Sequence, residues 1–191
     1  MICEITSPPH DNLSFKEMNK KQAEEYFEWY VSQIPLKIEL LEEIAASDGV
    51  KTVFDFTPES LIPIWEWHET KITYRQLTEE EIQAERNMHP EWMWDRIADR
   101  DLSFDTLYYC MALALYFAEV IIRNANGKVN WGFFSKPKNR MGVNEPTLLG
   151  FKCNQDLNPR RVLVNCTRKS AREFKSTRLK DAYDIWIKEV E

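Results

Sequence analysis

The sequence predicts an α+β fold with N-terminal helices, a long buried central helix, a small antiparallel sheet and a C-terminal helix. Three observations predict this class. Apolar residues recur at helical spacing in the first hundred positions, the segment 107–122 is almost entirely apolar, and alternating segments occur only after position 123. The 191 residues, 43% apolar and 29% charged, have the composition of a folded chain with one buried core.

Capping signals place the N-terminal helices. A capping box at Asn19 opens the first helix and another at Thr78 opens a later one, each with Gln or Glu three residues on. Pro35 ends the first helix and begins the second. Thr57 caps a third helix with proline in its first turn, and a short helix is expected over 91–98.

The central helix begins at the cap residue Ser103 and contains the apolar segment 107–122. That segment is shorter than the roughly 20 residues that a bilayer requires. We therefore expect a core helix and no membrane partner.

The second half of the chain changes character. Segments 129–134, 147–151 and 161–166 are candidate strands, the third after an Asn-Pro turn. A capping box formed by Ser170 and Glu173 then predicts the C-terminal helical region.

Charge divides the chain. Residues 1–102 carry 22 acidic and 10 basic side chains, a net of −12, whereas residues 103–191 carry 9 acidic and 15 basic, a net of +6. Residues 123–180 contain 14 basic side chains and only 3 acidic ones. This polarity is the main compositional indication of function.

We expect a flexible leader, residues 1–17, and a single globular domain, residues 18–191. Within the domain, an acidic helical part, 18–122, precedes a basic sheet-containing part, 123–191.

Glu119 is the candidate catalytic residue, because it is the only charged residue between Asp105 and Arg123. A carboxylate withdrawn from water there could act as an acid or base in an enzyme. The structural alternative is that Arg123, four residues on, or a Tyr hydroxyl or indole N–H satisfies it. We favour the structural alternative, since buried charges are usually paired and no His or Cys completes a catalytic set.

A basic stretch follows the first candidate strand. Basic groups beside aromatic rings hold single-stranded nucleic acid, because the charges track phosphates while the rings stack on bases. The acidic first half of the chain would repel such a polyanion, so a solvated or protein-contacting face is the favoured interpretation. The candidate binding residues are Lys136, Lys138, Arg140, Arg160, Arg161 and Trp131.

No metal site or cofactor is predicted. The three histidines, His10, His68 and His89, are far apart, and the four cysteines form no CxxC pair. Free thiols and the lack of a secretion signal near the start predict a cytoplasmic protein.

Two tryptophan pairs have a spacing of two residues, Trp65 with Trp67 and Trp92 with Trp94. On a helix this spacing allows one ring of each pair to be buried while the other reaches the surface. Core packing is the default interpretation, and an aromatic protein-contact patch is the alternative.

Three segments together resemble small uncharacterised bacterial cytosolic proteins, some of them immunity-like partners of secreted toxins. These are FDFTPESL at 54–61, YFAEVI at 116–121 and VNWGF at 129–133, followed by NEP at 144–146 and GF at 150–151. The resemblance covers roughly residues 18–166 and implies no catalytic residue. Ala118 stands where many such proteins have glycine.

The sequence therefore predicts a non-enzymatic cytoplasmic module that binds a protein partner, including the special case of an immunity-type protein that masks a toxin. An acidic surface can steer towards a basic, nuclease-like partner. The alternatives are nucleic-acid binding through residues 123–180 and an enzyme that uses Glu119.

Overall fold

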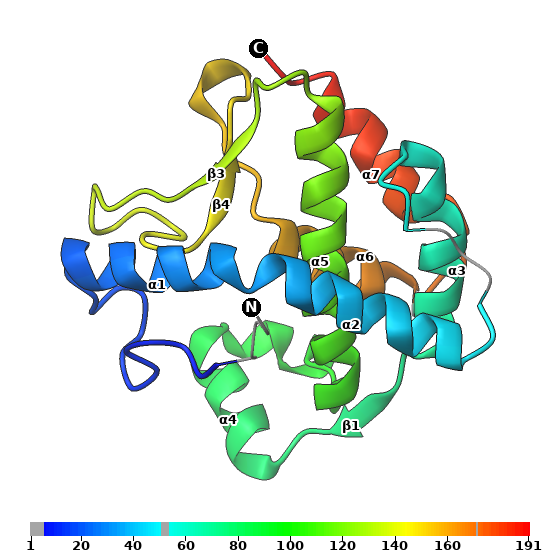
Figure 1. Ribbon diagram of the computed structural model, residues 1–191. Helices are drawn as coiled ribbons and strands as arrows, with labels where there is room; N and C mark the ends of the chain where they lie inside the picture. The colour runs from blue at the N-terminus through cyan, green and yellow to red at the C-terminus, as the bar shows by residue number, and fades with distance from the viewer. Residues whose placement is uncertain (1–5, 51–53, 171) are drawn as a thin grey trace.

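The computed structural model describes residues 6–50, 54–170 and 172–191, and these residues form seven α-helices, one of them central, together with two small antiparallel sheets (Figure 1). The predicted α+β class is confirmed.

Helices α1 (Lys20–Ser32) and α2 (Ile34–Ser47) follow one another almost end to end and cross the central helix (Figure 1). The Asn19 side chain accepts the Gln22 N–H at 3.0 Å, so the predicted capping box is present. Proline occupies the first turn of α2, as expected.

The N-terminal segment contacts the domain over its described part. Within residues 6–17, predicted as a flexible leader, His10 Nε2 lies 2.6 Å from Glu25, and the Phe15 carbonyl accepts an Asn144 amide at 2.7 Å. Met18, which follows, is buried.

The central helix α5 (Phe104–Asn124) forms the core, and Ser103 caps it by accepting the Thr106 N–H at 3.1 Å. Its burial is continuous from Ala112 to Ala118, whereas its first turns have one exposed face. Among the described residues, α5 alone is long and apolar enough to cross a membrane, but 61% of its most apolar window is buried in the fold, as in a core helix.

Two further helices and a short turn complete the core. η1 (Pro58–Ser60) leads into α3 (Leu61–Thr70), and Thr57 caps η1 as predicted. α7 (Arg178–Ile187) packs on α3, which closes the domain at the C-terminal end.

The predicted first and second strands form a two-stranded sheet, shorter than expected. β3 (Asn130–Gly132) pairs antiparallel with β4 (Thr147–Leu149), with Trp131 opposite Leu148. η3 (Lys152–Asn154) follows β4.

The predicted third strand, 161–166, is wrong, because this segment lies in helix α6 (Pro159–Ser170). Pro159, Leu163 and Thr167, spaced by four, are its buried residues and form one helical face on α5. Asn158 accepts the Arg161 N–H at 3.2 Å, so the Asn-Pro pair starts a helix and does not form a turn before a strand.

The capping box predicted from Ser170 and Glu173 is also wrong. Ser170 is the last residue of α6, and its hydroxyl donates to Glu69 of α3 at 2.6 Å. The next helix, α7, starts only at Arg178.

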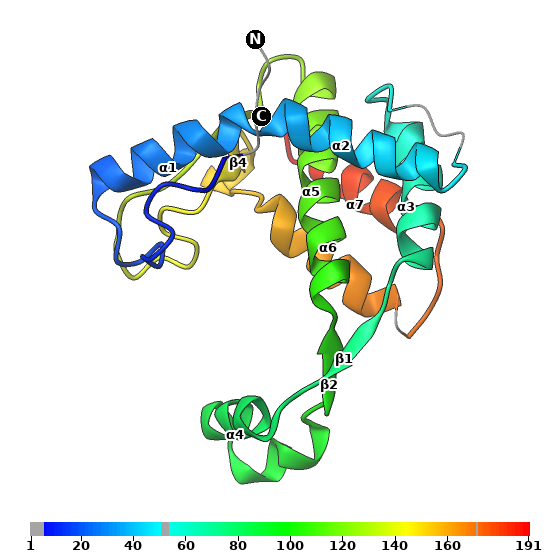
Figure 2. The same cartoon turned by 60° about the horizontal axis from the view of Figure 1, so that its bottom comes forward.

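An arm projects from the body between α3 and α5, and we define it as residues 74–102. β1 (Tyr74–Gln76) and β2 (Arg100–Leu102) pair antiparallel at its base and carry α4 (Glu79–Met88) and η2 (Glu91–Arg96) away from the other helices (Figure 2). Neither α4 nor η2 contains a buried residue.

Candidate functional site

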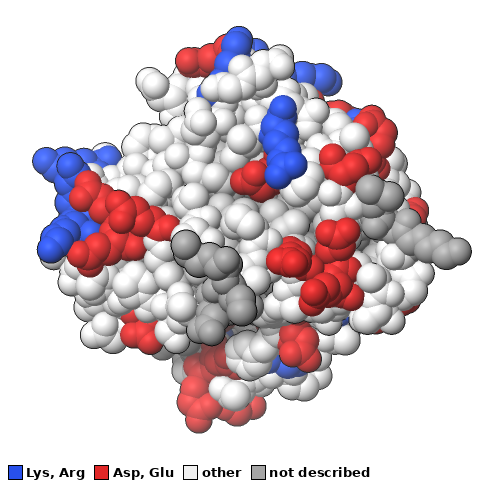
Figure 3. Space-filling view, in the orientation of Figure 1, with Lys and Arg blue, Asp and Glu red and all other residues white. Residues whose placement is uncertain are grey.

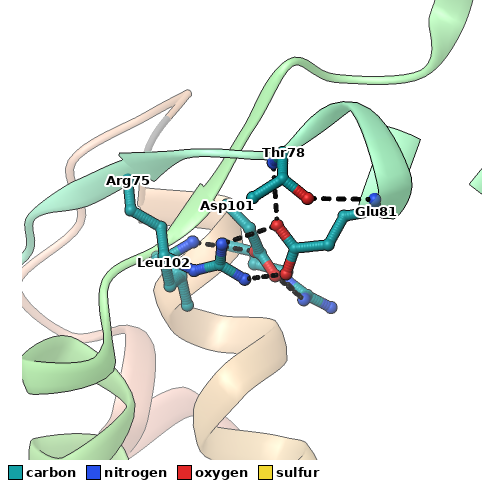
Figure 4. A network of polar contacts seen from close by, with 6 residues as sticks. Arg75, Thr78, Glu81, Asp101 and Leu102 are labelled. Carbon is teal, nitrogen blue, oxygen red and sulfur yellow. Dashed lines mark hydrogen bonds and ion pairs between the residues drawn. The ribbon is translucent and has the colours of Figure 1, made fainter. Parts of the chain in front are cut away.

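The arm is held by paired charges near its base and not by a core. Arg75 donates two hydrogen bonds to Glu81, at 2.8 and 2.6 Å, and Glu81 also closes the capping box of α4 with Thr78 (Figure 4). The hydrogen bonds from Arg75 lower the pKa of Glu81 to about 2. Arg168 of α6 donates to both oxygens of Asp101 at 3.1 Å and so ties the base of the arm to the body.

Large apolar side chains are concentrated on the arm and on the first turns of α5. Ten large apolar side chains are exposed among the described residues, and seven of them lie between positions 74 and 111. Trp92 is 71% exposed and Phe104 is 72% exposed. The seven are Tyr74, Met88, Trp92, Trp94, Phe104, Tyr108 and Met111.

The exposed apolar side chains of α5 share one helical face. Phe104, Leu107, Tyr108 and Met111 have the i, i+3, i+4, i+7 spacing of an apolar stripe, and each is at least partly exposed. Arg75 of the arm covers part of this stripe, with its guanidinium group 4.9 Å from the centroid of the Phe104 ring.

A cavity of about 740 Å³ lies between the arm and the C-terminal end of α6. Arg96, Arg100 and Arg172 line it, and none of them has an ion-pair partner among the described residues. Arg100 lies over the Tyr74 ring, 5.0 Å from its centroid. The lining of the cavity thus combines guanidinium groups and an aromatic ring with the carboxylates of Glu81, Glu85 and Asp101.

A second hollow, about 420 Å³, lies between α5 and α6, and we call it the α5–α6 groove. Its apolar lining is Leu107, Met111 and Val164. The guanidinium groups of Arg160, Arg161 and Arg168 surround these apolar side chains, together with only one carboxylate, that of Glu145.

Glu119, the candidate catalytic residue, contacts an indole N–H and Arg123, the kinds of partner expected if its role is structural. It accepts the Trp131 indole N–H at 3.1 Å, and Arg123 Nε lies 3.9 Å from its other oxygen. It lines none of the four best-formed cavities among the described residues. The arrangement is that of a satisfied carboxylate at the edge of the core.

The predicted basic binding residues are largely engaged within the fold. Arg140 pairs with Asp156 at 2.5 Å, and Arg161 pairs with Glu145 at 2.9 Å. Lys138 donates to a backbone carbonyl of the N-terminal segment at 2.7 Å.

The other three predicted binding residues differ in their surroundings. Lys136 is exposed, Arg160 is half-buried at the α5–α6 groove, and Trp131 is bonded to Glu119. The predicted set therefore does not form one free cationic surface.

A buried polar cluster joins α3, α5 and α6. His68 Nε2 lies 2.9 Å from Thr167 Oγ1, and Cys110 Sγ lies 3.2 Å from the same oxygen. Because the Thr167 hydroxyl donates to the Leu163 carbonyl at 2.9 Å, His68 must donate through Nε2, and Nδ1 remains buried without a partner.

This cluster is structural. His68, Cys110 and Thr167 are fully buried. Burial lowers the pKa of His68 to about 4 and raises the pKa of Cys110 to about 11, so both groups are neutral near pH 7. A neutral thiol without access to solvent is not a nucleophile.

Among the described residues, no group of three or more His, Cys, Asp or Glu could hold a metal ion. Cys110, Cys153 and Cys166 are free thiols, and Cys3 lies outside the described residues.

One feature of the sequence pointed indirectly to the exposed aromatic side chains of the arm. The Trp92 and Trp94 pair allowed an aromatic contact patch, and both rings are exposed in the structure, Trp94 to 37%. The exposed face of α5 could not be distinguished by hydropathy, because apolar residues continue around the whole helix.

No family model, no curated protein and no solved structure matches this chain.

Proposed function

We propose that this protein is a non-enzymatic protein-binding module whose contact surface is the arm together with the first turns of α5. The observation that carries the proposal is the concentration of seven of the ten exposed large apolar side chains of the described residues on this part of the chain. Contiguous exposed apolar surface on a small domain is characteristic of interaction sites, and aromatic residues and Met are enriched there. The proposal includes the cytoplasmic location expected from the free thiols.

Three features of the arm are those of a segment that binds a partner. It buries no residue of α4 or η2, so folding stability does not explain why the chain maintains it. Its paired charges fix its position before a partner arrives, which lowers the entropy cost of binding. Trp92, at the end of the arm, supplies a large rigid side chain of the kind that dominates interface energetics.

The finer proposal is immunity-type masking of a toxin. In support, α2 exposes Glu39, Glu42 and Glu43, none of which has an ion-pair partner among the described residues, and carboxylates gather over this helix (Figure 3). Such a face would speed the approach of a basic partner. This form of the proposal requires a toxin gene beside the gene for this chain.

A second candidate function is the binding of an anionic polymer such as single-stranded nucleic acid at the 740 Å³ cavity. Its support is the three guanidinium groups of Arg96, Arg100 and Arg172 beside an aromatic ring. Fluorescence anisotropy with single-stranded oligonucleotides tests it: affinity should fall steeply with salt, and a titration that stays flat at low salt removes this candidate.

Site-specific photo-cross-linking in cells tests the protein-binding proposal. A photoreactive amino acid replaces Trp92 on the arm or, as a matched control, Ile185 of α7, which is an exposed apolar side chain (64%) outside the proposed contact surface. We expect discrete cross-linked protein species from position 92 and not from position 185. The same cross-linking pattern at both positions would refute a specific role for the arm.

A further inference from the structure

The tip of the arm is acidic and aromatic. Residues 79–95 contain six carboxylates and one guanidinium group. At the end of the arm, Trp92 is 71% exposed, and the neighbouring carboxylates Glu91 and Asp95 are exposed as well. None of these three side chains is engaged with another described element through a hydrogen bond or an ion pair.

The α5–α6 groove has the complementary chemistry. It offers the apolar side chains of Leu107, Met111 and Val164 to an aromatic ring. Of the three guanidinium groups on its rim, Arg161 pairs with Glu145 and Arg168 pairs with Asp101. Arg160 on this rim has no ion-pair partner among the described residues. An acidic segment with an apolar anchor therefore matches the apolar lining and the unpaired positive charge of the groove.

The charge polarity of the chain is not neutralised within one copy. Of the twelve ion pairs between described residues, only two join the acidic part to the basic part, Arg123 with Glu119 and Arg168 with Asp101. The first of these is long, at 3.9 Å. The two parts thus retain opposite charge that is available to a second molecule.

We propose that the acidic turn of the arm, Glu91–Asp95, seats in the α5–α6 groove of a second copy of this chain, with Trp92 against Met111 and Val164. The inference rests on the proposed function and names a partner for its contact surface. The turn does not reach the groove of its own chain, because Trp92 is largely exposed while the Asp101–Arg168 pair holds the base of the arm beside that groove.

Reciprocal exchange gives a closed dimer. Each copy has one arm and one groove, so two contacts related by a two-fold axis satisfy both surfaces of both copies. A one-way contact would leave a free arm at one end and a free groove at the other, and would allow open chains. The basic rim and the acidic turn make the association salt-dependent.

Sedimentation velocity of the purified full-length chain, over a range of concentrations and at low and high salt, measures the association. We expect a dimer whose dissociation constant rises with salt. Trp92→Ser removes the anchor from the arm, and Met111→Glu places a carboxylate in the groove. Each should raise the dissociation constant by about tenfold or more, as loss of an interface hot spot does.

Mixing the two variants provides the decisive test. The Met111→Glu chain retains an intact arm, and the Trp92→Ser chain retains an intact groove, so their mixture should form a heterodimer through one intact contact. Ile185→Ser, at an exposed apolar site of α7, should dimerise as the wild type does. Circular dichroism of each variant excludes misfolding, and Arg160→Glu provides a second groove variant with an altered salt dependence.

The outcomes separate this inference from the proposed function. A wild-type chain that stays monomeric at every concentration, or a mixture no more associated than its components, overturns the dimer. If position 92 still cross-links to another protein in that case, the protein-binding function stands without self-association. A monomeric chain with no specific cross-link at position 92 overturns both the dimer and the protein-binding function. A dimer in which position 92 cross-links only to a second copy of the chain supports the dimer and overturns toxin masking.

Discussion

The buried imidazole of His68 predicts how the stability of this protein depends on pH. Its pKa is lowered to about 4 in the folded state from an ordinary value of 6.5, because burial disfavours the charged ring. The unfolded state therefore binds this proton at higher pH than the folded state does. The free energy of unfolding is unaffected by this group above about pH 6.5 and falls as pH decreases towards 4.

The size of the effect follows from the two pKa values. The full difference corresponds to about 3 kcal/mol, and linkage between pH 7 and pH 5 gives a loss of about 2 kcal/mol. His68→Gln removes the titrating group while it retains an amide donor near the position of Nε2. The variant loses stability at pH 7, by about 1–3 kcal/mol, because the contact with Thr167 is disturbed.

Urea unfolding followed by circular dichroism at pH 7 and pH 5 measures both quantities. The wild type should lose about 2 kcal/mol more than His68→Gln between these pH values, since contributions of other groups cancel in the comparison. His89→Gln, on a half-buried arm histidine, is the control and should retain most of the wild-type pH dependence. Equal pH dependence in wild type and His68→Gln would refute the buried neutral imidazole.

Three further substitutions test separate contacts. Gly150→Ala should cost about 3 kcal/mol or more in unfolding free energy, because φ is +112° and an added Cβ would lie 2.0 Å from the Lys128 carbonyl oxygen. Tyr116→Phe should cost about 1–3 kcal/mol, because the buried hydroxyl accepts the Phe56 N–H at 3.1 Å. Glu81→Gln should speed amide hydrogen exchange in α4 and leave the body unchanged, and in the wild type the same opening should occur as pH falls from about 4.5 towards 2.

These three predictions have their own controls. Tyr108→Phe changes an exposed hydroxyl and should alter stability by less than about 0.5 kcal/mol, so a similar loss in both tyrosine variants would contradict the buried contact. A Gly150→Ala chain as stable as the wild type would contradict the close approach to Lys128. Glu81→Gln should not alter exchange in α5; a global change would mean that the arm is part of the core.

Local signals in the sequence were sufficient for much of the fold. The capping boxes at Asn19 and Thr78, the proline in α2 and the caps at Thr57 and Ser103 are all present where predicted. Each of these signals acts within one turn of helix, so the chemistry that creates it is contained in adjacent residues. The apolar segment after Ser103 likewise specified the central helix.

Tertiary packing decided the elements that were missed. Segment 161–166 contains the short apolar run Val162–Val164, which is typical of a strand, but it forms part of helix α6 because residues of α6 bury one face on α5. β1 and β2 are three residues long and about two dozen positions apart, and no pattern so short specifies a partner.

The candidate site depended on similar long-range information. Glu119 was recognised from its isolation in an apolar segment, and its expected partners, Arg123 and an indole N–H, are both present. The Trp92 and Trp94 pair allowed an aromatic contact patch, but the sequence did not show that the patch lies on a projecting arm, because exposure depends on which distant elements cover a segment. Trp92 has the same neighbours in sequence whether it is buried or exposed.

The division of the chain into an acidic and a basic part corresponds to particular surfaces of the fold. Acidic residues concentrate on α2 and on the arm, and guanidinium groups line the α5–α6 groove and the cavity beside it. Most ion pairs form within each part, so the opposite charges of the two parts remain available to another molecule.

Removal of the arm tests most directly the central claim that it is a binding appendage. An Asn-Gly turn in place of residues 77–99 would join β1 to β2 as a two-residue hairpin. The measurement is the mass of the complexes that tagged full-length and arm-less chains form in extracts of the source cells at low salt. We predict that the full-length chain forms discrete complexes, whereas the arm-less chain folds and remains alone. Equal complexes from both chains, or an arm-less chain that does not fold, would contradict the claim.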